Sequence, residues 1–188
     1  QHVQLILDQS KALIRVGHVL ITENKAGIIG TNAGVDKSNV FGTKTYAIIP
    51  EDPNTLANQV QLDLESVFHR KIPIIITDSV GRPFREGSVG IAIGSVGVPV
   101  LLNCRQTTDL YGYRLQSKEV AILDQLASLA DMVMGQQDEA IPLVIIRGFR
   151  LLDSISKENL EGINAARLLR AKQKDLFRHL DWVSVIKY

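Results

Sequence analysis

The sequence predicts an α+β fold in which helices pack against mixed sheets, within a single unit that covers residues 1–188. Short apolar runs rich in β-branched residues, such as Ile72–Ile76, predict strands that are covered on both faces. Two longer segments, 51–70 and 118–135, carry apolar residues at helical spacing. Because strands and helices do not alternate regularly, we expect an α+β fold rather than a doubly wound parallel sheet. Neither a repeat nor a long linker marks a second domain.

The first fifty residues predict one helix followed by short strands. Apolar residues recur at helical spacing from His2 to Val16, and we expect this whole segment to be helical. Three strand-like runs follow, HVLIT, AGIIG and YAIIP. The polar, glycine-rich stretch TNAGVDKSNVFG lies between the second and third runs and is therefore expected to be a loop.

A helix is predicted over residues 51–70. Asp52 is a favoured N-cap residue, and Pro53 stands at the first helical position, where its missing N–H costs nothing. Leu56, Val60, Leu64 and Val67 are spaced to form the buried face.

The second half of the chain predicts further strands and two more helices. VGIAIG, VGVPVLLN and PLVIIRG are apolar runs typical of strands, and RQTTDLYGYRLQS reads as a turn-rich excursion. The helix at Lys118–Met134 has Val120, Leu123, Leu126, Ala127, Ala130 and Val133 on one face, with Gly135 as its C-terminal cap. Residues 149–158 predict a loop, and residues 159–180 predict a largely helical segment.

Composition excludes several classes of function. The net charge of +1, from 21 basic and 20 acidic residues, argues against a nucleic-acid surface. No apolar run approaches the roughly 20 residues that span a bilayer, so we expect no membrane segment. The single Cys104 excludes an internal disulfide and fits a reducing cytoplasm. The four histidines show no metal-binding spacing, so carboxylates would have to hold any bound metal.

The stretch TDSVGRPFREGSVGIAIG is the strongest candidate for a functional site. We expect Asp78 to stand where the buried strand leaves the sheet, beside Arg82 and Arg85, whose guanidinium groups match phosphate and carboxylate oxygens. Asp109, Glu119 and Asp124 supply further carboxylates, and Mg²⁺ or Mn²⁺ prefers such ligands together with nucleotide phosphates. The alternatives are a turn-capping aspartate, surface arginines, and a Glu119 that only compensates the dipole of its helix. The glycine-rich phosphate-binding motifs are absent.

Several of these segments, in this order, resemble the landmarks of the coenzyme F(420)-0:gamma-glutamyl ligase family. They are ITENKAGIIGTNAGVDKSNV, IIPEDP, TDSVGRPFREGSVGIAIGSVGV, TTDLYGYRLQSKEVAILDQLASLADMVMG and VIIRGF. The resemblance implies two intertwined α+β subdomains and a homodimer, whose partner chain we expect near the glycine-rich strands or the loop Asn32–Asn39. It also implies GTP- and metal-dependent amide formation through an acyl phosphate, joining L-glutamate to a deazaflavin coenzyme precursor.

The resemblance also assigns roles to individual residues. Metal binding, by Mg²⁺ or Mn²⁺ with K⁺ as a further candidate, is expected at Asp78, Glu119 and Asp109. Arg82 and Arg85 are expected to be catalytic through charge stabilisation on the transferred phosphoryl group. The residues expected to contact GTP are Gly81, Glu161, Gly162, Asn164 and Ala165, and those expected to bind substrate are Asn32, Asp36 and Asn39.

The chain also departs from the family pattern. Relative to other members it lacks an N-terminal segment of roughly a third of a domain that touches GTP, so we expect these residues to bind GTP weakly by themselves. Lys118 replaces a threonine before the helix acid, which disfavours a second cation there. Two rival hypotheses therefore stand beside the ligase: a non-enzymatic relative that binds an anionic metabolite or a partner chain, and a nucleotide-dependent ligase or phosphotransferase with another acceptor.

Overall fold

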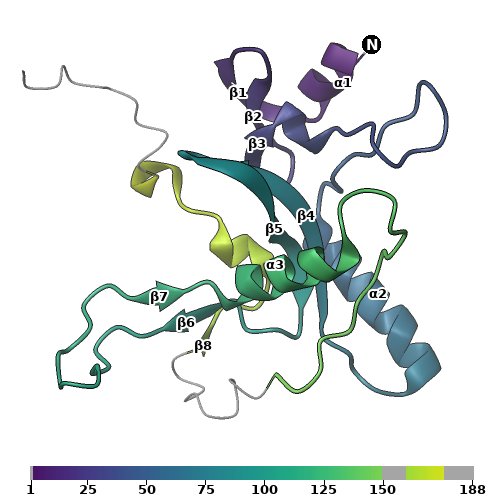
Figure 1. Cartoon of the computed structure of the whole chain (residues 1–188). Coiled ribbons are helices and arrows are strands. Elements are labelled where there is room, and N and C mark those ends of the chain that lie inside the picture. Colours follow the sequence, from purple (N-terminus) through teal and green to yellow (C-terminus); the bar gives the residue numbers. More distant parts are fainter. Residues whose placement is uncertain (1, 150–159, 176–188) are drawn as a thin grey trace, which may run out of the picture.

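The computed structural model describes residues 2–149 and 160–175, and it confirms an α+β fold (Figure 1). The helices are α1 (His2–Asp8), α2 (Pro53–Phe68) and α3 (Ile122–Met134), with short 3₁₀ turns η1 (Asn32–Gly34), η4 (Ala165–Leu168) and η5 (Lys172–Lys174). The strands are β1 (Ser10–Val16), β2 (Leu20–Asn24), β3 (Ile29–Thr31), β4 (Ile74–Arg82), β5 (Arg85–Val96), β6 (Leu101–Asn103), β7 (Glu119–Val120) and β8 (Leu160–Glu161). Within these ranges, no helix is long and apolar enough to cross a bilayer.

The strands form three small sheets, β1-β2-β3, β4-β5 and β7-β6-β8. Every pairing described is antiparallel, so the expectation of mixed sheets was wrong. Most paired strands follow one another in the chain and are joined by short turns or excursions, which bring neighbouring strands together in opposite directions. A parallel pair would need a long crossover connection.

The β4–β5 hairpin is the centre of the molecule, and α2 and α3 both pack against it (Figure 1). The main core lies between this hairpin, α3, β6 and the start of η4, and its buried members are Ala92, Val100, Leu101, Leu123, Ala127 and Ala165. A smaller cluster joins α1 to η1 through Ile6, Ala33 and Val35. Of the predicted site residues, Asp78, Gly81, Arg82 and Arg85 stand on this hairpin.

The apolar spacing predicted one helix from His2 to Val16, and this prediction was wrong. Helix α1 ends at Asp8, and β1 begins at Ser10, whose hydroxyl donates to the carbonyl of Ile6 at 2.6 Å. Serine competes in this way with the helical hydrogen bonds of the backbone. The residues that follow find β2 as a partner strand, and tertiary pairing overrides the helical pattern.

Helix α2 begins as predicted. Asp52 Oδ1 accepts hydrogen bonds from the backbone N–H groups of Asn54 and Thr55 at 3.0 and 3.1 Å, and Pro53 occupies the first turn. The buried face differs from the expected one, since it contains Pro53, Ala57 and Gln61, whereas the predicted Leu56 and Val67 are 40% and 67% exposed. The small Ala57 allows the helix to approach the hairpin closely.

The predicted strand at 72–76 does not end at Asp78, because β4 continues to Arg82 and turns through Pro83 and Phe84 into β5. VGIAIG is part of this one strand, Arg85–Val96, rather than a strand of its own. Phe84 has a positive φ of 60° and follows a proline, which suits the two central positions of a tight turn. Asp78 therefore lies within the hairpin and not at its end.

Four other predictions need correction. Residues 46–50 contribute a single bridge, Asp36 to Ala47, and no strand. Residues 118–121 do not belong to α3, which begins at Ile122. Residues 142–148 form no strand, because this apolar run finds no partner strand in the described ranges, and Leu143 is 61% exposed. Residues 160–175 form a short strand and 3₁₀ turns instead of a long helix, and residues 150–159 and 176–180 lie outside the described residues.

Candidate active site

Asp78 is a partly buried carboxylate in the middle of β4, opposite Ile91 of β5. Its Oδ1 accepts a hydrogen bond from the N–H of Ser79 at 2.9 Å. Burial raises the pKa of Asp78 above its usual value, and the charges of Asp36 and Asp131 raise it further, whereas the Ser79 hydrogen bond acts in the opposite direction. The fold thus holds this acid where its charge is costly, as is common for groups that bind cations or take part in catalysis.

The loop that contains the predicted substrate residues is tied to the same region. The side-chain oxygen of Asn32 accepts from the N–H of Leu20 at 3.2 Å, and the side chain of Asn39 donates to the carbonyl of Gln137, just after α3, at 2.8 Å. Asp36 closes a tight turn by accepting from Lys37 N–H and from both the N–H and the hydroxyl of Ser38. Although partial burial acts to raise it, these hydrogen bonds hold the pKa of Asp36 below its usual value.

Asp131 is a neighbour of Asp78 that the sequence did not single out. It stands in the last turns of α3, which rests directly on β5 at Gly90, where an added Cβ would lie 2.5 Å from the Cβ of Asp131. The close approach needs a glycine at that position. The charges of Asp36, in the loop after η1, and of Asp131, on α3, therefore both act on Asp78 of β4.

Arg82 and Arg85 face each other across the hairpin turn. The Nη2 of Arg82 donates to the carbonyl of Glu86 at 3.2 Å, and its Nε is buried with no hydrogen-bond partner among the described residues. Arg82 is four positions beyond Asp78 along the strand, which is a Cα separation of about 13 Å. The arginines are thus at the tip of the hairpin, whereas Asp78 lies in the middle of β4.

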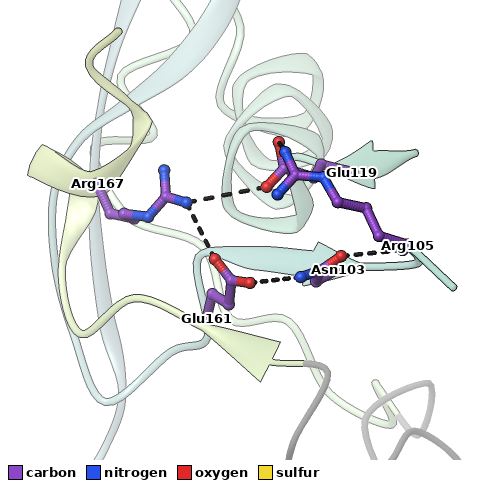
Figure 2. A network of polar contacts seen from close by, with 5 residues as sticks. All are labelled: Asn103, Arg105, Glu119, Glu161 and Arg167. Carbon is purple, nitrogen blue, oxygen red and sulfur yellow. Dashed lines mark hydrogen bonds and ion pairs between the residues drawn. The ribbon is translucent and has the colours of Figure 1, made fainter. Parts of the chain in front are cut away.

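Glu119 lies on β7, not at the start of a helix, and belongs to a polar network around Arg167 (Figure 2). Its Oε2 is 2.7 Å from Arg105, and its Oε1 is 3.8 Å from the Nη2 of Arg167. The same Nη2 lies 3.0 Å from Glu161 Oε2, and Asn103 donates to Glu161 Oε1 at 2.6 Å. The Asn103 and Arg167 hydrogen bonds lower the pKa of Glu161.

This network brings together one residue expected to bind metal, Glu119, and one expected to contact GTP, Glu161. Sequence reasoning did not find its two arginines. A basic run such as residues 167–178 cannot by itself show which carboxylates converge on one of its arginines.

Asp109 and Asp124 have local structural partners. Asp109 Oδ1 accepts from the N–H groups of Tyr111 and Tyr113 at 2.9 and 2.8 Å, which closes the tip of its own excursion. Asp124 Oδ1 accepts from the N–H of Ala92 at 3.0 Å, and burial raises the pKa of this acid. Within residues 2–149 and 160–175, no three His, Cys, Asp or Glu side chains are grouped so that they could hold a metal ion.

The segment expected to contact GTP borders a cavity of about 480 Å³. Gly162 has a positive φ of 89°, and the Asn164 side chain accepts from Ala166 N–H at 3.2 Å, so both residues shape the turn before η4. The cavity is lined by Asp52, Asn54, Thr55, Asn58, Ser95, Val96, Ile163, Asn164 and Ala166. A second cavity of about 290 Å³ lies on the β1–β3 side and shares Asp52, Asn54 and Ala166 with the first.

Comparison with known proteins identifies the class of this α+β protein. The family model for F420-0:gamma-glutamyl ligase matches residues 1–148, so the chain belongs to the F420-0:gamma-glutamyl ligase family, whose members are amide-bond ligases. It is 43% identical over 178 residues to the coenzyme F420:L-glutamate ligase of Methanocaldococcus jannaschii, covering 94% of this chain and 68% of that protein. The proteins of the same name from Methanopyrus kandleri and Methanothermobacter thermautotrophicus are 44% and 40% identical, each over 94% of this chain and 69% and 68% of their own lengths. The family resemblance of the sequence motifs is confirmed.

Proposed function

We propose that this chain catalyses the GTP- and metal-dependent formation of a gamma-glutamyl amide bond on a deazaflavin coenzyme precursor. The observation that carries the proposal is identity of 40–44% over 94% of the chain with coenzyme F420:L-glutamate ligases. The partly buried acid Asp78, on which the charge of Asp36 in the loop Asn32–Asn39 also acts, supports it, because a ligase of this type must gather phosphate, metal and carboxylate in one site.

The reaction can be written as two displacements. A carboxylate oxygen of the acceptor attacks the γ-phosphorus of GTP, the bond to the β-phosphate oxygen breaks, and GDP leaves. The amino group of L-glutamate then attacks the acyl carbon, the C–O bond to phosphate breaks, and phosphate and a proton are released. A bound Mg²⁺ or Mn²⁺ would supply charge stabilisation on the phosphoryl oxygens.

The donor chemistry of Asp78 fits such a cation. It is an oxygen ligand with one backbone hydrogen bond, and the charges of Asp36 and Asp131 act to raise its pKa, so a hard cation would relieve the cost of its own charge. Glu119 fits less well in the arrangement described, because the guanidinium groups of Arg105 and Arg167 already lie beside it, although its Oε1 accepts no hydrogen bond among the described residues. A cation shared by Asp78 and Glu119 would have to displace one of these arginines.

The remaining assignments follow from charge and position. Arg82 and Arg85 would bind phosphate or carboxylate oxygens at the tip of the hairpin. The Nε–H of Arg82 is a hydrogen-bond donor without a partner among the described residues. Asn32, Asp36 and Asn39 would contact the amino acid or the precursor. Gly81 and the segment Glu161–Ala165 would lie against GTP.

Gly81 gives a direct test of nucleotide contact. An added Cβ at Gly81 meets no atom within 4 Å, so Gly81→Ala should fold normally. If GTP lies against this backbone, the extra methyl group should weaken GTP binding by about tenfold or more, which corresponds to about 1.4 kcal/mol. Titration calorimetry with GTP and Mn²⁺ measures this effect, and the ligation itself is measured from GDP release and product mass with L-glutamate and the precursor.

Gly30→Ala is the matched control, since Gly30 also has open space around the added Cβ but lies on β3. Equal GTP affinity of the two variants and the wild type would contradict the contact at Gly81. A protein that binds neither GTP nor Mn²⁺ and forms no product, both as these 188 residues and when extended by the N-terminal segment of other family members, would favour the non-enzymatic relative instead.

We also expect a homodimer. Large apolar side chains are exposed at Phe41, at Leu110 and Tyr111 in the excursion before β7, and at Met132 on α3. Such surface is usually buried by association. Sedimentation at micromolar concentration should give twice the mass of the chain, whereas a single monomeric species would contradict the expectation.

A further inference from the structure

Strand β5 has one edge that no strand covers among the described residues, since it pairs with β4 alone. Side chains of the two helices bond its backbone there. From α3, Ser128 donates to the carbonyl of Gly90 at 2.7 Å and Asp124 accepts from the N–H of Ala92 at 3.0 Å. From α2, Asn54 Oδ1 accepts from the N–H of Ser95 at 3.1 Å. The backbone groups of successive strand residues point alternately to the two edges. A bulge between the Thr77–Ala92 and Ile76–Gly94 pairs shifts this alternation by one residue, so that the N–H of Ser95 points to the same edge as those of Gly90 and Ala92.

Asn54 has a second partner on another element. The same Oδ1 accepts from the N–H of Ala165, at the start of η4, also at 3.1 Å. Both N–H groups belong to buried residues, since Ser95 is 1% exposed and Ala165 is 3% exposed. Because Asp52 already caps α2, the Asn54 side chain is available for these two bonds. One carbonyl oxygen therefore connects α2, β5 and the turn before η4.

The residues around Ala165 are those that the proposed function assigns to GTP. Ile163, Asn164 and Ala166 line the larger cavity, and Asn54 and Ser95 line it from the other side. The nearby ion pair of Arg167 with Glu161 holds a different point of this segment, on the side of β6 and β7. Asn54 is thus a polar contact that ties Ala165 to β5.

We propose that Asn54 is a positioning residue for nucleotide binding, which holds the segment Glu161–Leu168 against β5 through Ala165. This inference rests on the proposed function, because it takes GTP as the ligand of that segment. Asn54 need not touch the nucleotide. Removal of the Asn54 side chain would let the turn shift within the cavity wall. The resulting loss of GTP affinity would be larger than the loss in kcat.

The test compares four proteins: the wild type, Asn54→Ala, Asn54→Asp and Gln59→Ala. Aspartate keeps an oxygen acceptor at the same place, and Gln59 is an exposed amide on the same helix that bonds only Asp63 among the contacts described. Amide hydrogen exchange of Ser95 and Ala165 is measured without ligand, and the KM for GTP and kcat are measured by GDP release.

Asn54→Ala should accelerate exchange at both amides and raise the KM for GTP about tenfold, the factor typical of one lost hydrogen bond, with a smaller change in kcat. Asn54→Asp should keep the wild-type exchange at both amides, because its carboxylate oxygen can still accept from them, and Gln59→Ala should behave as the wild type in every measurement. If the alanine variant does not fold, Asn54→Gln, which moves the oxygen by one methylene group, replaces it with the same expectations.

Unchanged exchange at Ala165 in Asn54→Ala would overturn the inference, and so would an unchanged KM for GTP in a variant whose exchange is accelerated. Accelerated exchange at Ser95 and Ala165 in Asn54→Asp would overturn it as well, because this variant keeps the oxygen acceptor. If the wild type itself shows no GTP turnover or binding, the proposed function falls and the nucleotide role of Asn54 with it. That result differs from an active wild type with an indifferent Asn54, which overturns this inference alone.

Discussion

Asp78→Asn should lower the ligation rate by about 10²- to 10³-fold, the usual cost of removing one preorganised charged or polar group from an active site. Asparagine has nearly the same shape and keeps an oxygen that can accept from Ser79 N–H, so the change removes the charge but not the hydrogen bond. Without the charge, the hairpin would lose its best ligand for a hard cation. GDP release in the presence of L-glutamate, precursor and Mn²⁺ measures the loss.

The same substitution should not destabilise the fold. Burial raises the pKa of Asp78, so the folded state disfavours the charged form of this acid. The stability that comes from this shift is fully present below the unfolded pKa of about 3.8 and is lost as the pH rises through the higher folded pKa. At neutral pH, Asp78→Asn should therefore be as stable as the wild type or more stable, and urea denaturation at pH 4 and pH 7 compares them.

Asp63→Asn is the control, because Asp63 is an exposed acid on α2 that accepts from Gln59. It should leave the ligation rate unchanged. An Asp78→Asn variant with wild-type turnover would show that the reaction does not use this carboxylate. A variant that is both inactive and unfolded at pH 7 would contradict the sign of the electrostatic argument.

Local signals in the sequence predicted local structure well. The Asp-Pro pair at 52–53 fixed the start of α2, and Gly135 caps α3 with a positive φ of 78° as expected. The errors arose where pairing with a strand distant in the sequence decides the secondary structure. Residues 10–16 have helical spacing but pair with β2, and residues 142–148 look like a buried strand but have no partner within the described residues.

The candidate site shows the same division. The sequence predicted functional roles for Asp78 and for the loop that contains Asp36. In the structure, the charge of Asp36 acts to raise the pKa of Asp78. The sequence could not predict that Asp131 lies near this site, because Asp131 approaches β5 only where Gly90 leaves room for α3. Nor could it predict that Arg105 would pair with Glu119, since the spacing of charges along a chain does not give their distance in space.

Gly94→Ala should be the most destabilising of the substitutions considered. An added Cβ at Gly94 would lie 2.2 Å from the carbonyl oxygen of Pro53 and 2.5 Å from its carbonyl carbon. These are backbone atoms in the first turn of α2, whose φ is fixed by the proline ring, so they cannot move without shifting the helix. Overpacking of this kind typically costs about 1–3 kcal/mol.

The shift would reach the site, because Asn54 follows Pro53 and bonds the N–H of Ser95, the residue after Gly94. The free energy of unfolding, measured by urea denaturation, should fall by about 3 kcal/mol in Gly94→Ala, at the upper end of that range. It should change by less than about 0.5 kcal/mol in Gly30→Ala, where the added Cβ meets no atom within 4 Å. Equal stability of the two variants would mean that α2 does not rest on β5 at Gly94. It would then also contradict the close contact that holds Asn54 beside Ser95.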